Sequence, residues 1–288
     1  MIKTLYRLII SKLPKKYRLA LSYFRVFGVF PNIESPQNFN EKVLNRILYN
    51  KDTQFSLLAD KYSVRKYIKE KIGEDYLIPL ILCTENPRDL YHMHQWEQIV
   101  IKPNHGAGMV KVIDNIPSQN EKKQIVQTAE VWLKNDYSKV VDEWHYSLIK
   151  PKLLVEQKIT KKNEALRDYK FHRFTSIDGS YRQILQVIAE RSEQGYETVF
   201  FDVKDLDNIL HSPFNYNLVL SLHEKEAIQK ILRLNESLCT EYKYVRLDWY
   251  ITKEKIYFGE ITFTPGAGRS SSFSGAFGEE IGKLWLMK

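Results

Sequence analysis

Apolar and polar residues alternate through residues 244–263, and a short charged break interrupts the alternation at 253–255. A period of two is typical of half-buried strands, so this segment predicts a β-hairpin. Its apolar positions are Val245, Leu247, Trp249 and Ile251 in the first strand and Tyr257, Gly259, Ile261 and Phe263 in the second.

A three-residue loop in this hairpin would place Asp248 opposite Glu260 and Arg246 opposite Thr262, and would pair Trp249 with Gly259. A slip of one residue would send each side chain to the opposite face. Two carboxylates directly across a strand pair have Cβ atoms about 5 Å apart and repel each other. Mg²⁺ takes oxygen ligands and often bridges to phosphate, so the hairpin predicts a magnesium site. The alternative is a surface hairpin with scattered charges.

The rest of the chain mixes helical and strand patterns. Apolar residues recur at helical spacing from Phe39 to Leu48, after a start signal at Ser35 or Asn38. Further helices are expected over 60–71, 119–135, 222–239 and near 279–287. Strands are expected over 77–82, 98–103, 109–113, 153–157, 169–174 and 182–188. This mixture predicts an α+β protein in which hairpins outnumber β-α-β units.

Length and composition limit the class of protein. The 288 residues are 43% hydrophobic, enough for a large core in one domain or two lobes. The longest apolar run near the start, residues 8–10, is far shorter than the roughly 20 residues of a membrane span. No small-residue cleavage site follows it, so we expect an unexported, cytoplasmic protein. Two cysteines are too few for a disulfide framework.

The net charge of +8 favours anionic partners. The cations are dispersed and no aromatic-rich RNA-binding strand is present, so we expect small anionic ligands and no nucleic acid. Residues 1–30 are basic and amphipathic. They form either a helix resting on acidic lipid at the inner face of the membrane or a terminal helix packed on the body.

A lysine and two glycines lie between two expected strands, at Lys102, Gly106 and Gly108. Glycines let a backbone approach phosphate closely, and a lysine at a strand end adds a fixed positive charge. The spacing matches neither a P-loop nor a dinucleotide fingerprint. Alone, this segment is better explained as an ordinary hairpin.

Three other polar positions are candidates for ligand contact. Glu156 ends a buried strand, and Lys61 stands at an expected helix start, where a cation is unfavourable to the helix dipole. Lys170 and His172 share one face of the strand at 169–174 and could meet a phosphate. A solvated lysine and a wet sheet face are the simpler explanations.

The order of these parts resembles the ATP-grasp fold, and within it the TupA-like ATP-grasp family of surface-polysaccharide biosynthesis. The resemblance covers most of the chain. It rests on residues 39–42 (FNEK), 58–65 (LADKYSVR), 71–79 (KIGEDYLIP), 102–106 (KPNHG), 168–171 (DYKF), 245–248 (VRLD) and 257–266 (YFGEITFTPG).

The resemblance implies a nucleotide between two α+β lobes: an N-terminal helical segment over 1–55, a first lobe over 56–155 and a second over 156–288. It implies ATP and two Mg²⁺ ions as cofactors. The implied phosphate contacts are Lys61, Lys102 and the loop with His105, Gly106 and Gly108, with Lys170 at the γ-phosphate and Arg246 at the transferring phosphoryl group. The implied adenine contact is Glu156, and Asn163 or Glu164 would lie near the ribose. The implied metal ligands are Asp248, Glu260 and Thr262, the last standing where many ATP-grasp enzymes have Asn.

The implied reaction is an ADP-forming carboxylate–amine ligation, in which an amino acid or amine is joined to a uronic-acid carboxyl of a surface polysaccharide or its precursor. A sugar kinase on the same fold is one alternative. A glycosyltransferase using the Asp205-Leu206-Asp207 motif is another, and a non-catalytic nucleotide-binding scaffold is a third.

Overall fold

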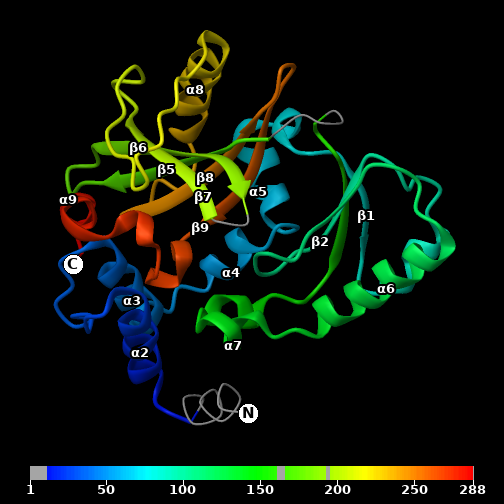
Figure 1. Cartoon of the computed structure of the whole chain (residues 1–288), viewed down its shortest axis with the longest axis horizontal. Coiled ribbons are helices and arrows are strands. Elements are labelled where there is room, and N and C mark those ends of the chain that lie inside the picture. Colours follow the sequence, from blue (N-terminus) through cyan, green and yellow to red (C-terminus); the bar gives the residue numbers. More distant parts are fainter. Residues whose placement is uncertain (1–11, 161–165, 193–194, 288) are drawn as a thin grey trace.

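The computed structural model describes residues 12–160, 166–192 and 195–287, which form two antiparallel sheets with helices around them (Figure 1). The smaller sheet has the order β1-β4-β2-β3, with bounds Leu80–Thr84, Leu153–Gln157, Ile99–Pro103 and Lys111–Ile113. The larger has the order β7-β6-β5-β8-β9, with bounds Gly195–Asp202, Tyr181–Ser192, Asp168–Thr175, Tyr244–Ile251 and Ile256–Thr262. The predicted α+β class is confirmed.

The helices begin and end largely where sequence signals place them. Helix α3 starts after Asn38, whose side chain accepts from the Glu41 backbone while Glu41 caps Asn38 in return. The helices are α2 (Lys15–Phe27), α3 (Phe39–Tyr49), α4 (Gln54–Ala59), α5 (Val64–Ile72), α6 (Gln119–Lys134), α7 (Tyr137–Val141), α8 (Leu222–Asn235) and α9 (Gly275–Leu284).

Several boundaries differ from the sequence-based expectations. The helix expected from residue 60 starts only at Val64, because Asp60 accepts hydrogen bonds from Tyr62 N and Ser63 Oγ in a turn. The helix expected over 222–239 ends at Asn235, and the last helix begins four residues and ends three residues earlier than expected. Strand β7 was not expected at all.

The hairpin β8–β9 confirms the key pairing but not the predicted loop. Asp248 lies opposite Glu260, and Arg246 opposite Thr262. Trp249, however, pairs with Phe258 and not with Gly259, because a bulge interrupts the register after Asp248. A 2.9 Å hydrogen bond from Thr252 N to Lys255 O closes the turn, so the loop is shorter than expected. The bulge compensates for this difference and restores the pairing of Asp248 with Glu260.

The two faces of the larger sheet differ. One face packs with α4, α5 and α8 in a core that includes Phe55, Ile68, Ile228 and Trp249. One end of the other face is covered by α2, α3 and α9 through residues such as Phe39, Tyr244 and Trp285. The smaller sheet packs on α6. The domain boundaries at 55/56 and 155/156 stay predictions, although α4 and α5 contribute to the larger sheet's core.

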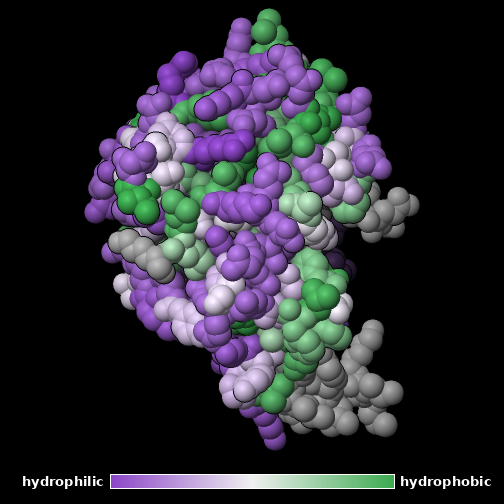
Figure 2. Space-filling view, turned by 90° about the vertical axis from the view of Figure 1, so that its left-hand side faces the viewer, coloured by the Kyte–Doolittle hydropathy of each residue, from purple (hydrophilic) through white to green (hydrophobic). Residues whose placement is uncertain are grey.

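Helix α2 packs on the body through Leu19 and Tyr23. Phe24 and Phe30 nevertheless stack on each other at 4.6 Å and stay 40% and 64% exposed. In Figure 2, apolar residues gather near the foot of the molecule beside the grey segment. None of the helices in the described ranges combines the length and apolarity required to traverse a bilayer. Membrane contact by residues 1–30 stays a prediction, and residues 1–11 lie outside the described part.

Helix α3 fixes the C-terminal part of the chain through polar side chains. Asn40 Nδ2 donates to Ser270 O and Phe273 O, both at 3.0 Å. Arg46 Nη1 donates to Tyr244 O at 2.9 Å and to Phe263 O at 3.0 Å, and its guanidinium lies over the Trp285 ring. The loop that follows β9 is therefore held by a helix more than 200 residues earlier in the chain.

Replacing Gly282 by Ala tests this contact between α9 and α3. The added Cβ would lie 2.4 Å from Gln37 O, a backbone atom that cannot turn aside. We expect Gly282→Ala to lower the free energy of unfolding by about 1–3 kcal/mol in urea denaturation. Lys283→Ala, on the exposed side of the same helix, is the control and should change it by less than about 0.5 kcal/mol. Equal effects would show that α9 does not pack as described.

Candidate active site

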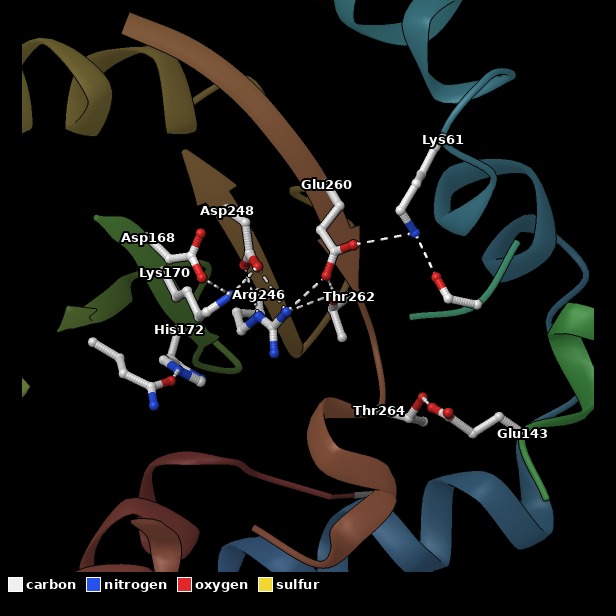
Figure 3. Close-up of polar contacts among 12 residues, drawn as sticks. Lys61, Glu143, Asp168, Lys170, His172, Arg246, Asp248, Glu260, Thr262 and Thr264 are labelled. Carbon is white, nitrogen blue, oxygen red and sulfur yellow. Dashed lines mark hydrogen bonds and ion pairs between the residues drawn. The ribbon is translucent and has the colours of Figure 1, made fainter. Parts of the chain in front are cut away.

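Two rows of polar side chains lie on the face of the larger sheet that α2, α3 and α9 cover at one end. Lys170, Asp248 and Glu260 are register partners on β5, β8 and β9 and form the first row. His172, Arg246 and Thr262 form the second row on the same three strands. Because side chains two residues apart share a face, both rows point the same way (Figure 3).

Arg246 lies at the centre of this face. Its Nε donates to Asp248 Oδ1 at 2.6 Å, and its Nη2 donates to Asp248 Oδ2 at 2.7 Å, Glu260 Oε1 at 2.9 Å and Thr262 Oγ1 at 3.1 Å. Burial alone would lower the pKa of Arg246, but Asp248 and Glu260 raise it above its usual range. One guanidinium therefore bridges the two facing acids.

Two lysines complete the neutralisation of these acids. Lys170 Nζ lies 2.7 Å from Asp248 Oδ2, and Lys61 Nζ lies 3.4 Å from Glu260 Oε2. Burial would raise the pKa of Glu260, but Lys61, Arg246 and Lys170 together hold it well below its usual range. Asp168, which the sequence analysis did not select, lies 3.7 Å from Lys170. Its position two residues before Lys170 on one strand was the signal that could have found it.

Lys61 links the two sheets. It lies in the turn between α4 and α5, and its Nζ also donates to Gly106 O at 2.7 Å (Figure 3). The turn is fixed by Asp60, whose Oδ1 accepts from Asn104 Nδ2 at 2.9 Å. The ammonium group thus connects the glycine loop of the smaller sheet with Glu260 of the larger sheet.

The glycine loop after β2 is anchored by buried polar groups. Asn104 is fully buried, and its Oδ1 accepts from Lys152 N at 2.8 Å. His105 is also buried, with Nδ1 3.3 Å from Asn104 Oδ1 and Nε2 3.2 Å from Asn135 O, and burial lowers its pKa. Gly106 and Gly108 both have positive φ, at 79° and 76°. Contact between this loop and a nucleotide stays a prediction.

Lys102 and Glu156 form a pair on the face of the smaller sheet opposite α6. Lys102 Nζ lies 2.6 Å from Glu156 Oε2, and Arg65 Nη1 lies 3.5 Å from Glu156 Oε1. Their strands are adjacent, with Val100 opposite Glu156. The structure therefore brings these two predicted residues together. The predicted ribose contact, Asn163 or Glu164, lies outside the described residues.

His172 does not act as a cation here. Its Nδ1 lies 2.9 Å from Tyr244 Oη and its Nε2 lies 3.0 Å from Gln186 Oε1. Burial, with a smaller contribution from Arg246, lowers its pKa to about 3. Neither of the two alternatives that the sequence left open for His172, contact with a phosphate beside Lys170 or a place on a wet sheet face, fits this buried side chain, which supports the sheet.

The oxygen groups on this face suit magnesium. Asp248, Glu260 and Thr262 offer two carboxylates and one hydroxyl, and Mg²⁺ is commonly held by one or two carboxylates together with phosphates and water. Within the described ranges, no cluster of three or more His, Cys, Asp or Glu residues could hold a metal ion. A metal on this face would therefore also need ligands from phosphate or water. The residues fit the ion, and their role as its ligands stays a prediction.

Comparisons with known proteins agree with this geometry. The TupA-like ATPgrasp family model matches residues 41–286. The chain belongs to the TupA-like ATP-grasp family. No curated protein matches it significantly.

One solved structure supports the same fold, and a second is similar at a lower score. A D-alanine–D-alanine ligase from Helicobacter pylori is 16% identical, with a TM-score of 0.50 over 80% of this chain and 62% of that one. D-alanyl-alanine synthetase A from Vibrio cholerae is 15% identical, with a TM-score of 0.48 over 79% of this chain and 60% of that one. The chain thus spans about three fifths of each relative, and the ATP-grasp fold is confirmed.

One buried acid near this face was missed by the sequence analysis. Glu143 lies between α7 and the 3-10 helix η3 (Trp144–Leu148), is 6% exposed and accepts a hydrogen bond from Thr264 Oγ1 (Figure 3). Burial raises its pKa to about 7, with Thr264 and Arg269 opposing the shift. No periodic signal marks it, because its partner is 121 residues away.

The two glycines of the loop allow a matched test. Ala at either position must adopt a left-handed backbone, at a cost of about 1–2 kcal/mol. At Gly106 the new Cβ would also lie 2.6 Å from Tyr137 Cγ, whereas at Gly108 nothing lies within 4 Å. We expect Gly106→Ala to be destabilised by at least about 1 kcal/mol more than Gly108→Ala in urea denaturation. The reverse order would contradict the packing of Tyr137.

The raised pKa of Glu143 predicts a pH-dependent stability. The folded state keeps the proton up to about pH 7, whereas the unfolded chain releases it near its ordinary pKa of 4.5. Between these values the folded state binds more protons, so wild-type stability should fall as pH rises, relative to Glu143→Gln. At 1.36 kcal/mol per pKa unit, the relative loss is about 3 kcal/mol. Urea denaturation at pH 4.5 and 7.5 measures it, and a difference that does not change with pH would refute the shift.

Proposed function

We propose that this protein is an ADP-forming carboxylate–amine ligase. It would use ATP to join an amine or amino acid to a uronic-acid carboxyl of a surface polysaccharide or its precursor. The observation that carries the proposal is the network of Arg246, Lys170 and Lys61 around Asp248 and Glu260 in a member of an ATP-grasp family. Such a face neutralises and positions charged groups, which is what phosphoryl transfer requires.

The reaction would proceed in two steps. A substrate carboxylate attacks the γ-phosphorus of ATP and releases ADP, giving an acyl phosphate. An amine then attacks the acyl carbon, and phosphate leaves as the amide forms. Bound Mg²⁺, held by Asp248, Glu260 and Thr262, would neutralise phosphate charge. Arg246 and Lys170 would stabilise the negative charge that develops at the transferred group.

The nucleotide would lie between the sheets. Lys61 and Lys102 would hold its phosphates under the loop of Gly106, and Glu156 with the backbone beyond it would meet the adenine. Glu156 already pairs with Lys102, so it would also fix that lysine toward the phosphates. Lys61 Nζ donates a hydrogen bond to Gly106 O, and this contact supports a role for both Lys61 and the loop in holding the phosphates.

The acceptor carboxylate would bind near Arg269. This half-buried arginine follows β9 on the loop that Asn40 holds, and no ion pair to it exists among the described residues. A guanidinium binds carboxylates in a bidentate manner. The uronate and the polysaccharide are suggested by the family, and the Helicobacter pylori relative is itself named as a ligase.

The alternative glycosyltransferase motif has a simpler explanation. Asp205 accepts hydrogen bonds from Asp207 N and Asn208 N within its own turn, and Asp207 pairs with Lys225 of α8. These contacts are those of a surface turn, so we favour the ATP-dependent reaction.

The test measures ADP release and product together. Wild type should release ADP only when ATP, Mg²⁺, a uronate and an amine are all present, with an amide as product. Asp248→Asn and Glu260→Gln should each lower the rate by about 10²–10³-fold, as expected when one electrostatic group is removed from an active site. Glu279→Gln, an exposed acid on α9, is the control.

Two outcomes would contradict the proposal. A stable sugar phosphate ester formed without an amine would identify a kinase. Binding of ATP with no ADP release from any pair of substrates would exclude both reactions.

A further inference from the structure

The segment between α6 and β4 forms a wall beside the glycine loop. Tyr137 makes a hydrogen bond with the Ala107 backbone, and its ring occupies the space that Gly106 leaves open. Tyr146 packs edge-on against Tyr137 with ring centroids 5.0 Å apart. Both phenols and Glu143 lie close enough to Glu260 for its charge to raise their pKa values. The wall therefore borders the polar face of the larger sheet.

Glu143 differs from the other acids around Arg246. Asp248, Glu260 and Asp168 each lie within 4 Å of a lysine or arginine nitrogen. Glu143 has no such ion pair among the described residues, and its hydrogen bond from Thr264 engages Oε1 only. Oε2 has no protein partner in the part of the chain that the structure describes.

A buried carboxylate without a cation is unfavourable, so such groups are ordinarily paired or functional. Thr264 and Arg269 come from the loop that would hold the acceptor, and Glu260 and Arg246 from the face that would hold the phosphates. Glu143 thus lies between the proposed phosphate and acceptor sites, where the second substrate has to arrive.

We propose that Glu143 receives the amine substrate: its free oxygen binds the substrate's ammonium group and removes one proton before attack. The assignment rests on the proposed ligase function and adds the residue that recognises the amine. The aromatic rings of Tyr137 and Tyr146 beside it suit a cationic group as well.

The substrate nitrogen loses two protons in this step, one to Glu143 and one to the departing phosphate. The ammonium R–NH₃⁺ gives one proton to the Glu143 carboxylate and becomes R–NH₂. The nitrogen lone pair forms the C–N bond at the acyl carbon, and the C–O bond to phosphate breaks with its electron pair. The second amine proton leaves with the phosphate, which departs as HPO₄²⁻. Glu143 then returns its proton to water.

The pKa of about 7 supports this role, because a general base works best when its pKa is near the operating pH. The groups that face Glu143 are Thr264 and Arg269 from the loop after β9, Glu260 from β9, Arg246 from β8, Tyr137 from α7, Tyr146 from η3 and Lys15 from α2.

Hydroxylamine separates the base from the rest of the reaction. It is uncharged at neutral pH and traps an acyl phosphate as a hydroxamate without giving up a proton first. We expect Glu143→Gln to lose amide formation by about 100-fold or more while it still forms hydroxamate from uronate, ATP and Mg²⁺. Glu279→Gln should retain both reactions.

Amide formation by Glu143→Gln at the wild-type rate would overturn the assignment and leave the ligase function intact. Absence of hydroxamate with the wild type would overturn the ligase function and this assignment with it.

Thr264→Val supplies a second test that keeps Glu143 in place. The Thr264 hydrogen bond lowers the pKa of Glu143, so its removal should shift the rising limb of the amide-formation pH profile to higher pH. The hydroxamate profile should not move. An amide profile identical to that of wild type would contradict the role of Glu143, even if Glu143→Gln fails to fold.

Discussion

Two carboxylates face each other on neighbouring strands, and the arrangement of the site follows from their repulsion. Asp248 and Glu260 can lie together only with positive charge between and around them. Arg246 comes from the same strand as Asp248, Lys170 from the adjacent strand, and Lys61 from a turn between two helices. Lys61 Nζ also donates to the carbonyl of Gly106. The cation that neutralises Glu260 on the larger sheet therefore also fixes the glycine loop of the smaller sheet.

The remainder of the chain holds this arrangement in place. Asn40, Lys42 and Arg46 of α3 donate to backbone carbonyl groups at the ends of β8 and β9 and in the C-terminal segments. Buried backbone oxygens need such donors, and supplying them from a single helix orders several loops at once. The loop that carries Thr264 and Arg269 is therefore a rigid border of the site. The proposed role of Glu143 depends on this border, because Thr264 donates a hydrogen bond to Glu143 Oε1.

Local patterns predicted the local features. The cap of α3 at Asn38 and the strand 153–157 depend on neighbouring residues, and both are observed. The Asp248–Glu260 pairing was also predicted, but through an incorrect loop length that the bulge compensates. The alternation of apolar and polar residues does not reveal this bulge, because the bulge depends on the close approach of Gly259 to the Asp248 backbone. The sequence left the role of His172 open, because its burial depends on tertiary contacts that no local pattern shows. Glu143 was missed because its environment comes from residues remote in sequence.

A crystal structure with Mg²⁺ and a non-hydrolysable ATP analogue would show whether the two facing acids hold the metal of a bound nucleotide. The expected result is a triphosphate between Lys61 and Lys102 on one side and Asp248 and Glu260 on the other, with the metal on those two carboxylates. A nucleotide bound elsewhere on the molecule, or one bound here with Asp248 and Glu260 still held only by Arg246 and the lysines, would contradict it.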